Sequence, residues 1–337
     1  MPAEWAPHEA TWLAWPRNAE TWPGPRLEHA REAYLRMLEA LLPGERVHLL
    51  VADASAAENV LGRLKRRGVQ ARNLILHEKP FTDSWIRDYG PSFVTKPAAK
   101  AWCKWTFNAW GGKYSNLSQD NLIFEDKSLV SDRVFETGIV LEGGSIEVNG
   151  EGTCLTTEQC LLQANRNPKL SREEIEAYLQ AYLGVSQILW LGEGIAGDDT
   201  DGHIDDVARF CAPSTILAAF EEDPADENHA ILKANWERLR GFRDPAGKPW
   251  KLVKFPMPGK YTEDGIRLPA SYANFYIANQ AVLLPVFKDA ADLRAEAILK
   301  ELFPRREVVA IDSRALVYGL GAIHCLTQQE PSISDLR

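Results

Sequence analysis

A cysteine near the C-terminus and a histidine among aspartates are the side chains of this chain best suited to chemistry. Cys325 follows Gly319, Gly321 and an apolar segment that we expect to be a strand, so a flexible turn is predicted to present its thiol to a cavity. A free cysteine is often simply buried, so the thiol gains meaning only from its partners. His203 lies in residues 197–206, which hold five aspartates. A thiol, an imidazole and several carboxylates together predict nucleophilic catalysis with acid and base assistance.

The aspartate-rich residues 197–206 permit two interpretations. One is a metal site built from Asp199, His203 and Asp205, but the glutamate and ligand rhythm of a calcium loop are missing, as is a second histidine four residues on. The other is acid and base machinery. If Ile204 begins a strand, His203 and Asp205 project to the same side, because side chains along a strand alternate with a period of two. We favour the second interpretation.

The segment from Asp83 to Pro91 contains two aspartates, an arginine and two aromatic residues before a Gly-Pro turn. Pairing of Arg87 with Asp83, and a core position for Trp85, are alternatives that the sequence leaves open. Asp88 is expected to be an unpaired carboxylate beside an indole ring. Such a pair clamps a flat cation through charge-assisted hydrogen bonds and cation–π contact.

This combination of groups favours attack by sulfur on a planar, cationic carbon. A neutral amide substrate would call for an oxyanion hole and a Cys–His pair without extra acids. A guanidinium instead needs carboxylates at its edges, because its five N–H donors lie in one plane and carry a positive charge. The bound cation would in turn favour the Cys325 thiolate, which is a minority species at the usual thiol pKa of about 8.5.

Composition narrows the class of partner. The 337 residues include 38 basic and 47 acidic side chains, and the longest basic run is Lys65-Arg66-Arg67, so nucleic acid is disfavoured and a small cationic ligand is favoured. Five cysteines without a Cys-x-x-Cys pair argue against a disulfide framework and a structural zinc site, and fit a reducing cytoplasm. The first residues do not form a leader peptide and no apolar run reaches about 18 residues, so neither export nor membrane insertion is expected.

Strands and helices are predicted to alternate along the chain. Apolar spacing, caps and turn residues predict helices over 26–42, 55–67, 171–183, 227–239 and 289–302. Strands are predicted over 5–16, 47–51, 74–76, 140–141, 146–148, 154–156, 188–191, 206–210, 215–220, 273–277, 281–286 and 308–311. Residues 241–265 are expected to be mostly connection. No low-complexity linker divides the chain, which predicts an α/β protein.

A longer period runs through these elements. Turn residues recur at intervals of about 50 to 75 positions, which predicts a supersecondary unit repeated about five times. Any mixed α/β protein shows helices this often, which is the alternative. If the repeat is real, it brings one turn of each unit to a common axis. The turn residues are Trp12, Asp88, Gly144, His203, Asn274 and Cys325.

Six ordered motifs resemble those of the agmatine deiminases in the Porphyromonas-type peptidylarginine deiminase family, a group of guanidino-group-modifying enzymes. The motifs are MPAEWAPHEATW at 1–12, WIRDYGP at 85–91, LEGGS at 141–145, GHID at 202–205, ANFY at 273–276 and GAIHC at 321–325. They span essentially the whole chain. The resemblance implies a single catalytic domain over residues 1–337 with the pentein fold, a five-module α/β propeller of ββαβ units in a pseudo-fivefold arrangement.

Carried over residue by residue, the resemblance implies four catalytic side chains. Cys325 is then the nucleophile and His203 the general acid and base, while Asp88 and Asp205 hold the nitrogens of the guanidinium. The turn at 142–144 supports this site.

The resemblance also implies a set of substrate-binding residues beyond Asp88 and Asp205. Trp85 lines the entrance, Asn274 matches a family asparagine near the site, and Gly321 belongs to the turn before the nucleophile. The residue four positions before the histidine is often glutamate in this family and is Asp199 here, one methylene shorter, which alters its reach.

The implied reaction is hydrolysis of agmatine to N-carbamoylputrescine and ammonia through a covalent cysteine intermediate, in putrescine and polyamine biosynthesis, without a metal or an organic cofactor. Peptidylarginine and arginine are alternative substrates, although the chain shows no insertion comparable to that of the arginine deiminases. A metal-dependent hydrolase centred on Asp199, His203 and Asp205, and a catalytically silent binding protein of the same fold, are the rival classes. The sequence does not define the oligomeric state, and a homodimer is one option.

Overall fold

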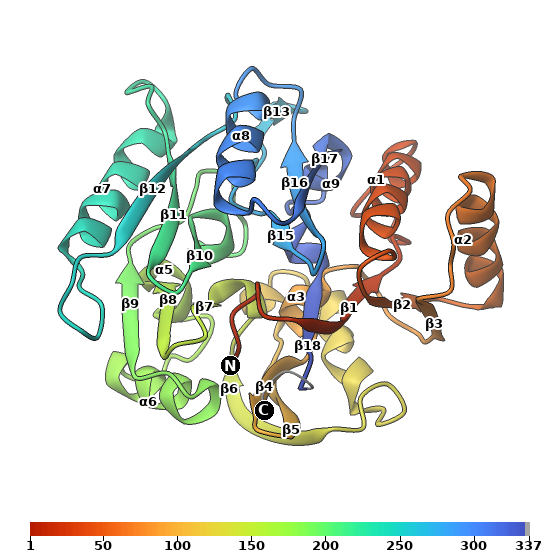
Figure 1. The fold of residues 1–337 in the computed structure, drawn as a ribbon, viewed down its shortest axis with the longest axis horizontal. Helices are drawn as coiled ribbons and strands as arrows, with labels where there is room; N and C mark the ends of the chain where they lie inside the picture. The colour runs from red at the N-terminus through yellow and green to blue at the C-terminus, as the bar shows by residue number, and fades with distance from the viewer. Residues whose placement is uncertain (334–337) are drawn as a thin grey trace.

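The computed structural model describes residues 1–333. Within this range, five small sheets repeat one pairing pattern, in which two antiparallel strands are followed by a third strand parallel to the second (Figure 1). In sheet order they are β18 (Gln328–Pro331), β1 (His8–Ala14), β2 (Arg46–Val51) and the added β3 (Leu74–Glu78); β4 (Ser92–Lys96), β5 (Ala99–Thr106) and β6 (Arg133–Val140); β7 (Glu147–Val148), β8 (Thr153–Thr157) and β9 (Gln187–Leu191); β10 (Ala208–Ala212), β11 (Thr215–Phe220) and β12 (Lys251–Pro256); and β15 (Tyr276–Ile277), β16 (Ala281–Val286) and β17 (Glu307–Asp312).

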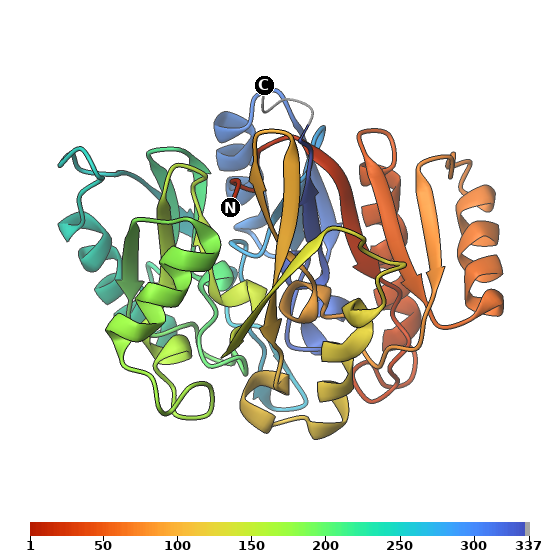
Figure 2. The ribbon, with the colours of Figure 1, turned by 90° about the horizontal axis from the view of Figure 1, so that it is seen from below.

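Helices make the crossovers between the parallel strands, as parallel pairing requires. They are α1 (Arg26–Leu41), α2 (Ala54–Arg66), α6 (Arg172–Leu183), α7 (Glu227–Gly241) and α8 (Asp292–Leu302), while α4 (Ala109–Gly112) and the 3₁₀ segment η1 (Ser115–Glu125) join β5 to β6. Both views place α2 and α7 at opposite ends of the long axis, with the strands between them (Figures 1 and 2). Within residues 1–333, no helix is long and apolar enough to cross a membrane.

Short helical segments lie where the sheets give way to loops. They are α3 (Ile86–Tyr89), α5 (Glu158–Leu161) and α9 (Arg314–Tyr318), with the 3₁₀ turns η2 (Gly143–Ser145), η3 (Ile204–Asp206) and η4 (His324–Leu326). A separate two-stranded hairpin consists of β13 (Thr262–Glu263) and β14 (Ile266–Arg267). The turns η2, η3 and η4 and the helix α3 contain residues of the motifs at 141–145, 202–205, 321–325 and 85–91.

The predicted alternation of strands and helices is confirmed where elements were predicted, with two differences. Ile204 begins the 3₁₀ turn η3, and the strand predicted over 206–210 is β10, two residues further on. The predicted connection over 241–265 contains β12, whose residues pair with β11, a strand that is buried at every position except Phe220. The strands β4, β5 and nearly all of β6 lie in residues 77–139, for which no element was predicted. The strand predicted over 308–311, before the Gly319 turn, is β17, and the residues between it and Gly319, for which no element was predicted, form α9. Leu316 and Val317 of this helix are fully buried, so packing decides the outcome for a short apolar run.

Candidate active site

A cavity of about 360 Å³ leads from the surface to buried polar groups. Its lining includes the exposed side chains of Tyr114 and Ile266, and also Asp88 and Cys325, each only 5% exposed. A ligand that enters this cavity therefore meets a thiol and a carboxylate that are shielded from bulk water.

Asn274 holds the cysteine in place. Its amide oxygen accepts the backbone N–H groups of His324 and Cys325 at 2.9 and 3.3 Å, and its amide nitrogen donates to the Cys325 Sγ at 3.1 Å. The same nitrogen donates to Asp206 at 3.1 Å. Asn274 thus fixes both the turn η4 and the sulfur, which agrees with its predicted place near the site.

Gly321 leaves room for the cavity wall. A Cβ atom added there would lie 2.5 Å from the ring of Trp85 and 3.1 Å from the Cβ of Cys325. Trp85 is held from behind by Trp22, with ring centroids 5.5 Å apart. Trp85 therefore lines the cavity beside the nucleophile, and its buried position serves both the core and the site.

Two neighbours fix the carboxylate of Asp88 in the first turn of α3. One oxygen accepts the backbone N–H of Gly144 at 3.0 Å and the other accepts the indole N–H of Trp110 at 2.9 Å. Within residues 1–333, no lysine or arginine pairs with Asp88, as predicted, but the indole that binds it is Trp110, which comes from α4, and not Trp85. Each carboxylate oxygen keeps further acceptor capacity for a ligand.

Arg87 does not pair with Asp83. It donates to Gln329 at 2.7 Å and lies 3.4 Å from Glu4. Asp83 accepts hydrogen bonds from Thr21 and, at 3.0 Å, from Asn18. The Arg87 side chain is buried among these partners, so the Arg87–Asp83 pair that the sequence left open is excluded.

His203 and Asp205 converge with Asp88 on one point, although η3 is not a strand. A Cβ on Gly144 would lie 2.5 Å from His203 Nδ1, 3.0 Å from Asp88 Oδ1 and 3.2 Å from Asp205 Oδ2. Asp205 Oδ2 also lies 3.7 Å from the Cys325 Sγ. The four residues predicted to be catalytic are thus brought together around a position that only glycine leaves open.

Several buried polar atoms at this point have no hydrogen-bond partner. They are both ring nitrogens of His203, Oδ1 of Asp205 and Oε2 of Glu142. The second oxygen of Glu142 is bound by Arg166 at 2.6 Å, and its free oxygen lies 3.9 Å from His203 Nε2. Buried polar groups are normally paired, so this arrangement favours a polar ligand or water in the site.

Burial and charge set the protonation states of the empty site. Burial, together with the charges of Asp205, Asp206 and Asp88, raises the pKa of the Cys325 thiol well above its usual value. Burial lowers the pKa of His203 to about 3. Burial and the charges of Asp205 and Glu142 raise the pKa of Asp88 well above its usual range. The unliganded site therefore holds a neutral thiol and a neutral imidazole.

Asp199 lies on the cavity wall and not among the converging groups. Its carboxylate accepts the hydroxyl of Tyr114 at 2.6 Å and the amine of Lys113 at 3.3 Å. Within residues 1–333, the groups of donor atoms close enough to share a metal ion do not include the Asp199, His203 and Asp205 set. The structure does not assemble the ligand set of the metal hypothesis.

Three further residues at the site were not assigned a role from the sequence. Trp110 binds Asp88, His324 lies between Asp205 and Glu4, and Glu4 reaches the site from the N-terminal segment. The motifs at 1–12 and 321–325 contain Glu4 and His324, so the only available signal was their presence in those motifs.

Comparisons with known proteins agree with this architecture. The agmatine deiminase of Enterococcus faecalis superposes with a TM-score of 0.91 at 35% identity, covering 99% of this chain and 96% of that one. A substrate-bound cysteine-to-serine variant of the C. jejuni agmatine deiminase gives 0.87 at 31%, with 98% and 96% covered. The agmatine deiminase of Pseudomonas fluorescens is 40% identical over 360 residues, which cover 98% of this chain and 95% of that protein.

The protein thus has the mixed α/β fold of the solved agmatine deiminases. A family model described as Porphyromonas-type peptidyl-arginine deiminase matches residues 1–331. The chain belongs to this family.

Proposed function

We propose that this protein hydrolyses agmatine to N-carbamoylputrescine and ammonia. The observation that carries the proposal is the convergence of Asp88, His203 and Asp205 beside the Cys325 thiol, at the buried end of an open cavity. Relatives that are named agmatine deiminase match this chain over nearly its full length, which supports the same conclusion.

Binding comes first. The flat guanidinium lies against Asp88 and Asp205, whose oxygens accept its N–H groups, while Trp85 and Gly321 shape the wall along its face. Burial and neighbouring negative charges raise the pKa values of Asp88 and of the thiol. A bound cation opposes the effect of those charges, so it favours the ionised form of both groups.

Chemistry follows in two halves. In the first, the thiol proton passes to His203, the Cys325 sulfur bonds to the central carbon, and His203 returns the proton to the departing ammonia. In the second, His203 takes a proton from water, whose oxygen bonds to the same carbon as the carbon–sulfur bond breaks. The proton on His203 then returns to the sulfur, the second proton of the water passes from the product oxygen to solvent, and the urea product leaves. Covalent catalysis divides one difficult barrier into two smaller ones.

The charge of the cavity wall favours agmatine over arginine. Its acidic residues are Glu20, Asp83, Asp88, Asp199, Glu263 and Asp264, and in the described part of the chain no lysine or arginine lines it. Arg26 and Lys113 neutralise part of this charge from outside the lining. A ligand arm that ends in an ammonium group is attracted by such a wall, whereas an α-carboxylate is repelled.

The proposal includes the pentein architecture. The five sheets form one propeller-like domain around the site, with the predicted site residues in the connections that precede β4, β10, β15 and β18. The position of β7, β10, β15 and β18 toward the middle of the view, with β9, β12, β17 and β3 outside them, supports this arrangement (Figure 1).

An ammonia-release panel tests the proposed activity. The purified protein is expected to release ammonia from agmatine with a kcat/KM at least about a hundredfold above that for arginine, since one unfavourable charge contact in a shielded site is worth a few kcal/mol. Peptidylarginine and methylated arginines complete the panel. Equal rates with arginine would contradict the role of the acidic wall. Release from none of these guanidines would favour a binding protein of the same fold.

A further inference from the structure

His324, the residue before the nucleophile, is held on both sides by carboxylates. Its Nδ1 lies 2.7 Å from Asp205 Oδ2 and its Nε2 lies 2.8 Å from Glu4 Oε2. The three side chains are at most 3% exposed. We propose that His324 is a positioning residue, a doubly hydrogen-bonded imidazolium that keeps Asp205 ionised and aimed at the substrate guanidinium.

The hydrogen bonds define the charge. An ionised carboxylate only accepts, so two carboxylate partners require that both ring nitrogens donate, which only the imidazolium does. Glu4 is ionised, because its Oε1 also accepts Arg209 and the Ile277 backbone N–H, each at 2.8 Å. Burial alone would raise the pKa of Asp205, but the hydrogen bond from His324 and the charge of His324 lower it.

The balance of buried charge supports the same assignment. The buried carboxylates facing this network are Glu4, Asp205 and Glu147, and the buried cations are Arg87, Arg209 and His324. Both oxygens of Glu147 accept N–H donors, from Arg209 at 3.0 Å and from the backbone of Phe210 at 2.9 Å. With a charged His324 the three negative and three positive groups cancel, whereas a neutral ring leaves an uncompensated buried charge, which is costly.

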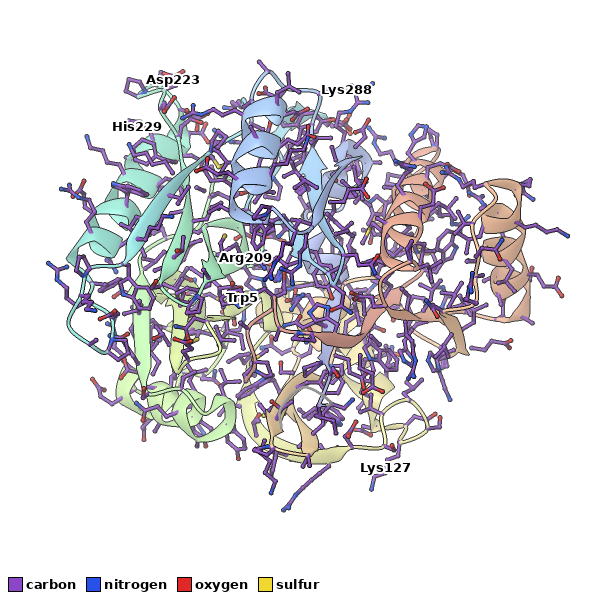
Figure 3. The ribbon with its side chains drawn as sticks, viewed as in Figure 1. Trp5, Lys127, Arg209, Asp223, His229 and Lys288 are labelled. Carbon is purple, nitrogen blue, oxygen red and sulfur yellow. The ribbon has the colours of Figure 1, made fainter. Side chains whose placement is uncertain are left out.

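Other charged and titratable groups also lie near His324. Its carbonyl accepts the Arg87 Nε at 3.3 Å, and the site groups beyond Asp205 are His203, Cys325, Asp206 and Asp88. Figure 3 shows Arg209 near the middle of the molecule, beside the N-terminal segment that carries Trp5 and Glu4. The network therefore ties that segment to the catalytic carboxylate.

This assignment gives the two carboxylates that hold the guanidinium different ionisation states before substrate binds. Its kinetic consequence rests on the proposed function. Asp205 is ionised before substrate arrives, whereas Asp88 carries a raised pKa and is ionised by the substrate. Without the charge of His324, both carboxylates would bind protons in the empty site, so substrate would have to displace two protons instead of one.

The test replaces the imidazole with a neutral donor of similar size. His324→Gln is expected to lower kcat/KM for agmatine about a hundredfold near pH 6 and less than tenfold near pH 9, because a protonated Asp205 has no negative charge to hold the guanidinium until the pH rises. On the acid side of the pH profile, the slope of log kcat/KM against pH should rise toward two, because two protons must then be lost before substrate binds. Glu4→Gln removes one carboxylate partner and should shift the limb in the same direction by a smaller amount. Thermal unfolding reports whether each variant is folded.

His229→Gln is the matched control, since His229 lies on α7 at the edge of the molecule and contacts the Glu221 carbonyl (Figure 3). Its profile should match the wild type. An equal loss at both pH values for folded His324→Gln and Glu4→Gln would overturn the proposal, because a purely structural role does not depend on pH. Nitrogen NMR of selectively labelled histidine, without substrate, tests the charge directly: a neutral His324 ring near pH 7 would overturn the assignment even if agmatine is the substrate, while absent ammonia release would refute only the proposed function.

Discussion

Replacing Cys325 with serine is expected to lower the turnover of agmatine by at least about 10⁴-fold while changing agmatine affinity by less than tenfold. The serine hydroxyl keeps the size of the group and its contact with Asn274, but a neutral hydroxyl is a far weaker nucleophile than a thiolate, and the carboxylates around it oppose its ionisation. In the proposed complex the guanidinium contacts belong to Asp88 and Asp205, so binding is expected to survive. Ammonia release and isothermal titration calorimetry measure the two quantities.

The control for this variant is Cys103→Ser. Cys103 is also fully buried, on β5, and its thiol donates to the Tyr182 carbonyl, a contact that serine can keep. Its turnover should stay within a factor of about two of the wild type, because the residue lies outside the cavity lining. Turnover retained by the Cys325 variant would remove the sulfur from the mechanism.

Adding a single methyl group at Gly144 is expected to reduce kcat/KM for agmatine by about 10³-fold. The new Cβ of Gly144→Ala would lie 2.5 Å from His203 Nδ1, which is closer than side chains tolerate, and 3.0 Å from Asp88 Oδ1, which is a tight contact. The imidazole and the carboxylate must therefore move apart, and the space where the guanidinium binds is partly filled. The loss of activity is expected to come from misplacement of His203 and Asp88, because η2 can accommodate alanine only by displacing these groups.

Gly241→Ala provides the comparison, because a Cβ at this position at the end of α7 meets no atom within 4 Å. Steady-state kinetics should leave this control unchanged, and urea denaturation should show both variants folded. A Gly144→Ala enzyme with normal kcat/KM would mean that His203 and Asp88 need not meet at this point, and the proposed geometry would fail.

Local signals account for the parts of the fold that the sequence predicted well. The capping box of Ser171 and Glu174 and the left-handed Gly184 bound α6 as expected, and Asn149-Gly150 turns between β7 and β8. Ile204 was expected to begin a strand and lies in a 3₁₀ turn, and residues 314–318, for which no element was predicted, form a short helix, because short apolar runs do not distinguish the two forms before packing is known.

The candidate site likewise has residues that local motifs predict and contacts that they do not predict. Its nucleophile, histidine and aspartates lie in short motifs whose residue types already suggest chemistry, so their convergence could be expected. The contact of Trp110 with Asp88 and that of Glu4 with His324 join segments 22 and 320 residues apart. No local pattern encodes such contacts, since they exist only once the sheets have packed together.

The protonated state of Cys325 in the empty site has a consequence for the life of the enzyme. Peroxides and other electrophiles react with thiolates far faster than with thiols, and oxidation of the sulfur beyond the sulfenic acid is hard to reverse. A thiol that ionises only when a cation is bound remains unreactive toward oxidants before substrate binds. It becomes reactive when the ligand already fills the path by which an oxidant would arrive.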